Sequence, residues 1–122
     1  MNSLKLNVEL NELLTLKEFI EKHYRKDMQT KLAVEEIFVN IVNYSNADYI
    51  IVNIEYDDIL TIEFIDNGIE FDSTQKEHKH PKTLKETPIG GLGILLAKNY
   101  ADELIYTYDN GENHLKIIKN VE

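Results

Sequence analysis

Apolar and polar residues alternate with the period of a β-strand in several parts of the chain. Three segments show this alternation or are rich in β-branched apolar residues: 4–10, 49–56 and 59–65. Asp57-Asp58 separates the last two and predicts a two-residue hairpin turn. The closing segment 103–119 predicts a second hairpin with Asn110-Gly111 at its turn. The pattern therefore predicts one strand near the N-terminus and two hairpins.

Apolar residues also recur at the spacing of a helix. Three segments have this spacing: Leu13 to about Tyr24, near Asp27 to Asn43 or Ser45, and about Leu92 to Ala101. Asn11 precedes the first of them and is predicted to cap it. Residues 66 to 88 show neither period. So long a gap inside a compact domain is typical of a functional loop or lid.

The order of these elements predicts the fold class. It runs strand, two helices, two strands, loop, helix, two strands, so the strands cluster in hairpins instead of alternating singly with helices. Because hairpins make antiparallel neighbours, we predict an α+β fold. It would be a two-layer α/β sandwich with a mostly antiparallel mixed sheet and helices on one face. The length predicts a single domain over residues 1–122.

Composition changes the expected partners. The chain has 22 acidic and 13 basic residues and a formal net charge of −9, so it repels a phosphate backbone and no nucleic acid is expected. It has no apolar run of about 20 residues and no signal-peptide pattern, so we expect no membrane partner and a cytoplasmic location. It also has no cysteine, which excludes disulfides and thiolate metal sites. Four lysines and two histidines in 76–85 form a local exception that could receive an anionic ligand.

Three polar residues share one side of the second predicted helix. Glu36, Asn40 and Asn43 lie within about 60° of one another if each residue turns the helix by about 100°. A solvated helix face is one interpretation. The other is a functional stripe, in which the carboxylate orients an attacking hydroxyl or water and an amide oxygen binds Mg²⁺.

Asp66-Asn67-Gly68 directly follows a predicted strand, and it can be simply a turn. Alternatively, the Asp66 carboxylate could accept a hydrogen bond from an exocyclic amino group while Gly68 leaves room for a flat ring. Adenine would meet both demands.

Gly90, Gly91 and Gly93 precede the third predicted helix. They can form a hinge, and the pattern is not a P-loop because no Gly-Lys-Ser/Thr follows. Alternatively, residues without side chains let backbone N–H groups and a helix dipole approach a phosphate.

Taken in order, these motifs resemble the ATP-binding domain of the GHKL superfamily, the fold shared by gyrase, histidine kinases and mismatch-repair ATPases. The order is Glu36-x3-Asn40, Asp66-x-Gly68, a long loop, and Gly91-x-Gly93 at a helix start. The resemblance spans nearly the whole chain. "AVEEIFVNIVNYS" and "PIGGLGILLAK" are most similar to the anti-sigma-factor serine/threonine kinases.

The resemblance implies a role for each motif. Glu36 would be the catalytic base and Asn40 the Mg²⁺ ligand. Asp66 would bind the adenine amino group, and Gly68 would line the base pocket. The remaining predicted contacts to ATP are Asn43, where some relatives carry a phosphate-contacting residue, the backbone of Gly91-Leu92-Gly93, and a lid over about 73–89.

The resemblance also implies an activity. The protein would use Mg-ATP to phosphorylate a serine or threonine of a STAS-domain anti-anti-sigma protein, and it could also sequester a sigma factor. The oligomeric state stays open, a homodimer included. An ATPase half of a histidine kinase is a weaker alternative.

Two positions depart from the family pattern. Glu70 stands where many members have a second glycine, and 113–119 contains no threonine to lie beside the base pocket. These departures favour another alternative, a protein-binding module with little or no ATP turnover.

Overall fold

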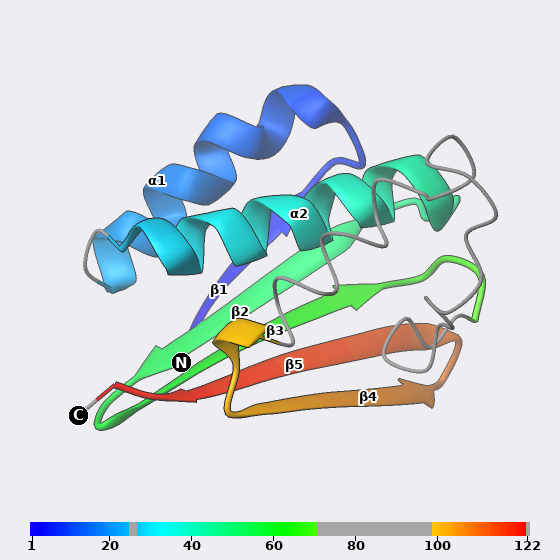
Figure 1. The fold of residues 1–122 in the computed structure, drawn as a ribbon. Helices are drawn as coiled ribbons and strands as arrows, with labels where there is room; N and C mark the ends of the chain where they lie inside the picture. Colours follow the sequence, from blue (N-terminus) through cyan, green and yellow to red (C-terminus); the bar gives the residue numbers. More distant parts are fainter. Residues whose placement is uncertain (25–26, 71–98, 122) are drawn as a thin grey trace, which may run out of the picture.

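In the described part of the chain, two α-helices pack against one antiparallel sheet (Figure 1). The computed structural model describes residues 1–24, 27–70 and 99–121. The strands are β1 (Asn2–Leu6), β2 (Ile50–Tyr56), β3 (Ile59–Asp66), β4 (Glu103–Asp109) and β5 (Glu112–Asn120). The helical elements are the 3₁₀ turn η1 (Leu10–Glu12), α1 (Leu13–His23) and α2 (Met28–Tyr44).

The strand order in the sheet is β1-β2-β3-β5-β4, and every pairing is antiparallel. Both α1 and α2 lie on one face of this sheet (Figure 1). The predicted fold class is thus confirmed, with the refinement that the described strands form no parallel pair.

The core lies between this face of the sheet and the helices. Alternate residues of the three central strands point into it in two rows that run across the sheet: Ile54, Ile62 and Ile117, then Val52, Phe64 and Leu115. The helices add the fully buried side chains Leu16, Ile20, Val34, Ile37 and Phe38. Every second residue is buried in the strands, and one side is buried in each helix. Both patterns have the same cause, because each element has one apolar side that must be covered.

Side-chain hydrogen bonds fix the start of α2. Asp27 caps the helix by accepting from the N–H of Gln29 at 3.2 Å. The helix thus begins near Asp27, as the sequence predicted. Thr30 donates to the same carboxylate at 2.8 Å, and its hydroxyl lies 2.6 Å from that of Tyr100. Tyr100 thus ties the chain that leads into β4 to the first turn of α2. No helix in the described part of the chain is both long and apolar enough to cross a bilayer.

The N-terminal prediction was partly wrong. The first strand was expected over 4–10, but β1 ends at Leu6. Asn11 does not cap α1, because it lies inside η1, where the N–H of Glu12 donates to the carbonyl of Glu9 at 3.0 Å. The reason is geometric: the chain must leave the sheet edge and enter the helix layer, and this reversal uses the residues after Leu6.

Both predicted hairpins are confirmed. Asp57-Asp58 joins β2 to β3, and Asn110-Gly111 joins β4 to β5. Asn110 and Gly111 have φ angles of 53° and 75°, the left-handed values that a two-residue turn between twisted strands requires. Of the third predicted helix, Asn99 and Tyr100 are helical, and residues 92–98 lie outside the described part of the chain.

Two leucines of α1 give a matched test of this core. Leu16 is fully buried, whereas Leu14 is 65% exposed. Leu16→Ala should lower the free energy of unfolding by about 2–5 kcal/mol, because it deletes buried methyl groups and leaves a cavity. Leu14→Ala should change it by about 0.5 kcal/mol or less. Urea unfolding followed by circular dichroism measures both, and equal losses would contradict the packing of α1 on the sheet.

Candidate functional site

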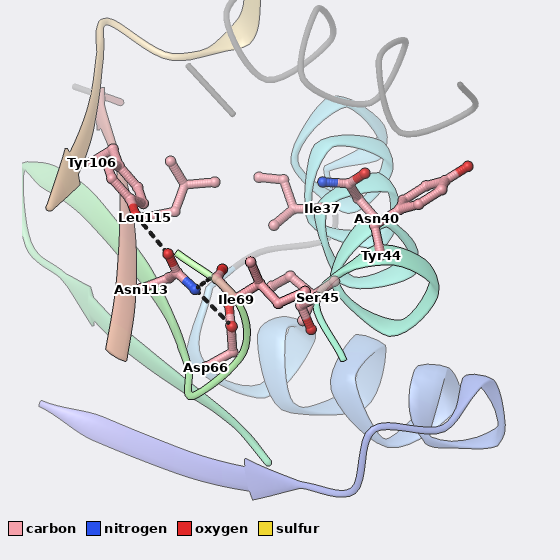
Figure 2. A pocket seen from close by; sticks show the side chains of 10 residues that line it. Ile37, Asn40, Tyr44, Ser45, Asp66, Ile69, Tyr106, Asn113 and Leu115 are labelled. Carbon is pink, nitrogen blue, oxygen red and sulfur yellow. Dashed lines mark hydrogen bonds between the residues drawn. The ribbon is translucent and has the colours of Figure 1, made fainter. Parts of the chain in front are cut away.

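A pocket lies between the C-terminal half of α2 and the buried face of the sheet (Figure 2). In the described part of the chain, the residues that line it come from α2 and its C-cap, the end of β3 and the turn after it, β4 and β5: Ile37, Asn40, Ile41, Tyr44, Ser45, Asp66, Ile69, Tyr106, Asn113 and Leu115. The pocket volume is about 40 Å³, and the pocket is partly open to solvent. A ligand larger than this space would extend through the open side or displace side chains at the rim. Tyr44 and Ile69 line the pocket and are 50% and 62% exposed.

Asp66 is the buried acidic residue of this pocket. It ends β3 and follows the same alternation as Ile62 and Phe64, so its side chain points to the buried face and is only 5% exposed. Its Oδ1 accepts from the backbone N–H of Gly68 at 2.9 Å and from the Asn113 amide at 3.1 Å. No described residue donates a hydrogen bond to Oδ2, so that oxygen can still accept one.

The environment of Asp66 acts on its charge in two directions. Burial raises the pKa of Asp66 above its ordinary value and is the largest effect. The N–H of Gly68, the Asn113 amide and the more distant His114 lower the pKa, while Glu112 raises it. The two direct donors therefore oppose the desolvation of the carboxylate and favour its ionised form.

Asn113 is a site residue that the sequence analysis missed. It lies directly opposite Asp66 in the β3–β5 pairing and is 6% exposed. Its Nδ2 donates to the Ile69 carbonyl at 2.9 Å as well as to Asp66, and its Oδ1 accepts from the Tyr106 hydroxyl at 2.5 Å (Figure 2). The sequence did contain a signal for it. Asn113 is two residues before Leu115 and four before Ile117, so the strand alternation places this polar residue on the buried face.

The turn after β3 is bound closely to the end of α2. The N–H of Ile69 donates to the Ser45 carbonyl at 2.9 Å. A Cβ on Gly68 would lie 2.3 Å from that carbonyl oxygen, so only glycine fits. Asn67 adds a second link, since its Oδ1 accepts from the N–H of Asp48 at 2.7 Å. Gly68 is not among the lining residues named above, and the room it provides in this structure is for the backbone of Ser45, the C-cap of α2.

Of the three polar residues predicted to share one side of α2, only Asn40 is among the described residues that line the pocket. Asn40 lines the pocket, and its side chain is labelled in Figure 2. Glu36 lies one turn earlier and is half-buried, whereas Asn43 is exposed and does not line the pocket. Glu70 is also exposed and outside the lining. The structure therefore brings Asn40 and Asp66 to one pocket.

Gly91, Leu92 and Gly93 lie outside the described residues, as do the predicted lid over 73–89 and the basic segment 76–85. Their contacts with phosphate stay predictions.

The comparison with known families identifies one domain. The family model described as the histidine kinase-like ATPase domain matches residues 8–119. This range contains all of the described residues that line the pocket. No curated protein is significantly similar to the chain.

Gly68→Ala tests the contact between the turn and α2. The added methyl group should lower the free energy of unfolding by about 1–3 kcal/mol, because the Ser45 backbone would have to move away. Gly111→Asn is the control: nothing lies within 4 Å of a Cβ there, and asparagine tolerates its positive φ. Thermal unfolding measures both variants. A Gly68→Ala protein as stable as the control would show that this contact is not tight.

Proposed function

The chain belongs to the histidine kinase-like ATPase family, a family of ATP-binding domains, and from this premise we propose that it is a regulatory serine/threonine kinase of the anti-sigma-factor type. Its substrates would be Mg-ATP and a STAS-domain anti-anti-sigma protein. It would also sequester a sigma factor.

One observation carries the nucleotide part of this proposal: Asp66 is a buried carboxylate with one uncommitted oxygen in a pocket with mainly apolar walls. An ionised carboxylate only accepts hydrogen bonds. The 6-amino group of adenine donates them, and the apolar walls suit a flat ring. Asp66 would therefore bind the amino group, and Ile37, Ile41 and Leu115 would contact the ring.

The residues present also fit Mg²⁺ that is bound together with phosphates. Within the described ranges, no three acidic or histidine side chains cluster into a metal site. Asn40 offers one amide oxygen at the pocket. Mg²⁺ commonly keeps several waters and takes few protein ligands when substrate phosphates supply the rest. Asn40 would hold this ion, which would offset the negative charge of the transferred phosphoryl group.

Glu36 would act on the attacking hydroxyl. It lies one helical turn from Asn40 on α2. An attacking hydroxyl beside the terminal phosphate could therefore be near both side chains. Its carboxylate would accept the proton of a serine or threonine hydroxyl and aim its oxygen at the terminal phosphoryl group. Asn43 and the backbone of Gly91-Leu92-Gly93 would contact the phosphates, and residues 73–89 would close over them.

A protein-binding module with little ATP turnover is the second candidate. The small volume of the pocket, about 40 Å³, favours it, because sites for small molecules commonly measure several hundred Å³. Glu70 supports it less than the sequence suggested, since its exposed side chain does not line the pocket.

A thermal melt distinguishes the two candidates. Mg-ATP at about 100 times its dissociation constant should stabilise the protein by about 2.7 kcal/mol. For a chain of this size the midpoint should rise by about 10 °C. Mg²⁺ alone is the control. An unchanged midpoint at millimolar nucleotide would favour the binding module and remove the kinase.

Two substitutions on α2 separate transfer from binding. Glu36→Gln should keep nucleotide affinity within about tenfold and lower phosphoryl transfer by about 10² or more, because shape is retained while the base is lost. Asn40→Ala should weaken Mg-dependent binding as well, because it removes a metal ligand. Single-turnover transfer of labelled phosphate to a STAS-domain protein, measured beside nucleotide affinity, gives both quantities.

Glu35→Gln is the matched control, because Glu35 is the neighbouring carboxylate and pairs with Lys17 at 3.5 Å on another side of the helix. It should transfer phosphate at the parental rate. A Glu36→Gln protein that does the same would remove Glu36 from the mechanism.

A further inference from the structure

Asn113 and Tyr106 form a short hydrogen-bonded chain that ends on Asp66 (Figure 2). We infer that this pair holds the Asp66 carboxylate in the orientation and ionised form that select a 6-amino purine over a 6-oxo purine. The inference rests on the proposed function, because it concerns the base of the bound nucleotide.

The orientation of the Asn113 amide follows from its neighbours. Its Nδ2 lies 3.1 Å from Asp66 Oδ1, 2.9 Å from the Ile69 carbonyl and 3.4 Å from the Gly68 carbonyl, and all three are acceptors. The reversed amide would place its oxygen against three other oxygens. The Tyr106 hydroxyl must then be the donor to Oδ1, at 2.5 Å. Each atom of the Asn113 amide thus has one permitted role.

Asn113 acts through Asp66 and does not contact the base by this amide. An amide nitrogen has two hydrogens, and the Asp66 carboxylate and the Ile69 carbonyl accept them. Tyr106 reaches Asn113 diagonally across the β4–β5 pairing, in which Tyr106 is opposite Leu115. Both are therefore positioning residues. Asn113 lies on β5, the strand in which the sequence lacks the threonine that many family members carry beside the base pocket.

The selectivity follows from the state of Asp66. With Oδ1 fixed by two donors, Oδ2 is left as a pure acceptor, which binds a 6-amino group and repels the oxygen of a 6-oxo group. A protonated Asp66 could instead donate to a 6-oxo group. The charged groups that act on Asp66 are Glu112 and His114 on β5, and Asp66 itself acts on Tyr49 before β2. The hydroxyls of Tyr44 and Tyr106 also belong to residues that line the pocket. Of these groups, the substitutions below change Tyr106 alone.

Three variants test the pair. Tyr106→Phe removes the hydroxyl that donates to the Asn113 amide oxygen, Asn113→Leu removes the amide that donates to Asp66, and Asn113→Thr restores a donor hydroxyl. Tyr108→Phe is the matched control, since Tyr108 is on the same strand, exposed and outside the pocket. Equilibrium competition between ATP and GTP, in Mg²⁺ buffer from pH 5 to pH 8, measures the preference of each protein without requiring phosphoryl transfer.

The preference for ATP should fall about tenfold in Tyr106→Phe and in Asn113→Leu, the effect of about one lost hydrogen bond. It should recover at least in part in Asn113→Thr and stay unchanged in Tyr108→Phe. In every protein it should weaken as the pH falls through the pKa of Asp66, because the carboxylate then binds a proton. The two defective variants should lose the preference at a higher pH than the parent. Carbon-13 NMR of the ligand-free proteins should show the matching rise in the pKa of Asp66 when its donor is removed.

The outcomes separate this inference from the proposed function. A parent protein that binds neither nucleotide overturns both. A parent that prefers ATP, with the same preference in Tyr106→Phe and Asn113→Leu, overturns the inference alone. If Asn113→Leu does not fold, Tyr106→Phe decides, because the phenyl ring keeps the packing of Tyr106.

Discussion

The hydrogen bond from the N–H of Ile69 to the Ser45 carbonyl, at 2.9 Å, joins the helix layer to the sheet at the end of α2. It is possible only because Gly68 has no Cβ that would collide with the same carbonyl oxygen. This contact sets the separation between α2 and the turn after β3. The pocket lies in the space that this separation leaves, and Asn40 and Asp66 reach it from opposite layers.

At the pocket, the buried face of the sheet changes from apolar to polar residues. Two rows of apolar residues cross the central strands, and the next row along β3 and β5 consists of Asp66 and Asn113. A buried carboxylate without donors would cost several kcal/mol, whereas here the carboxylate and the amide are hydrogen-bonded to each other and to the turn. The polar row is therefore compatible with a stable core, and it leaves one carboxylate oxygen for a ligand.

Much of the fold could be predicted from local patterns. The two hairpins and α2, with its start near Asp27, follow from periodicity and from short-range turn chemistry. Asp66 could be identified as a site candidate because a carboxylate directly after an apolar strand is conspicuous in the sequence. The end of β1 could not be predicted, because the reversal into η1 depends on where the helix layer lies.

The partners within the site were also not predictable. Asn113 becomes important only through the register of β3 against β5, which pairs residues 47 positions apart. Likewise, Gly68 was expected to make room for a ring, whereas in this structure the Ser45 backbone occupies that room. In both cases the deciding neighbour is distant in the sequence, and local patterns do not contain it.

The register that pairs Asp66 with Asn113 also bears on the order in which the protein folds. The β2–β3 and β4–β5 hairpins close through two-residue turns, so each needs only local contacts. The β3–β5 seam must close a long stretch of chain, which carries a larger entropic cost and makes it a late step. Because the Asp66 carboxylate gains its Asn113 donor only at this seam, a partly folded chain with both hairpins formed still lacks the complete site. A nucleotide that binds there would slow the opening of this seam before it affected either hairpin.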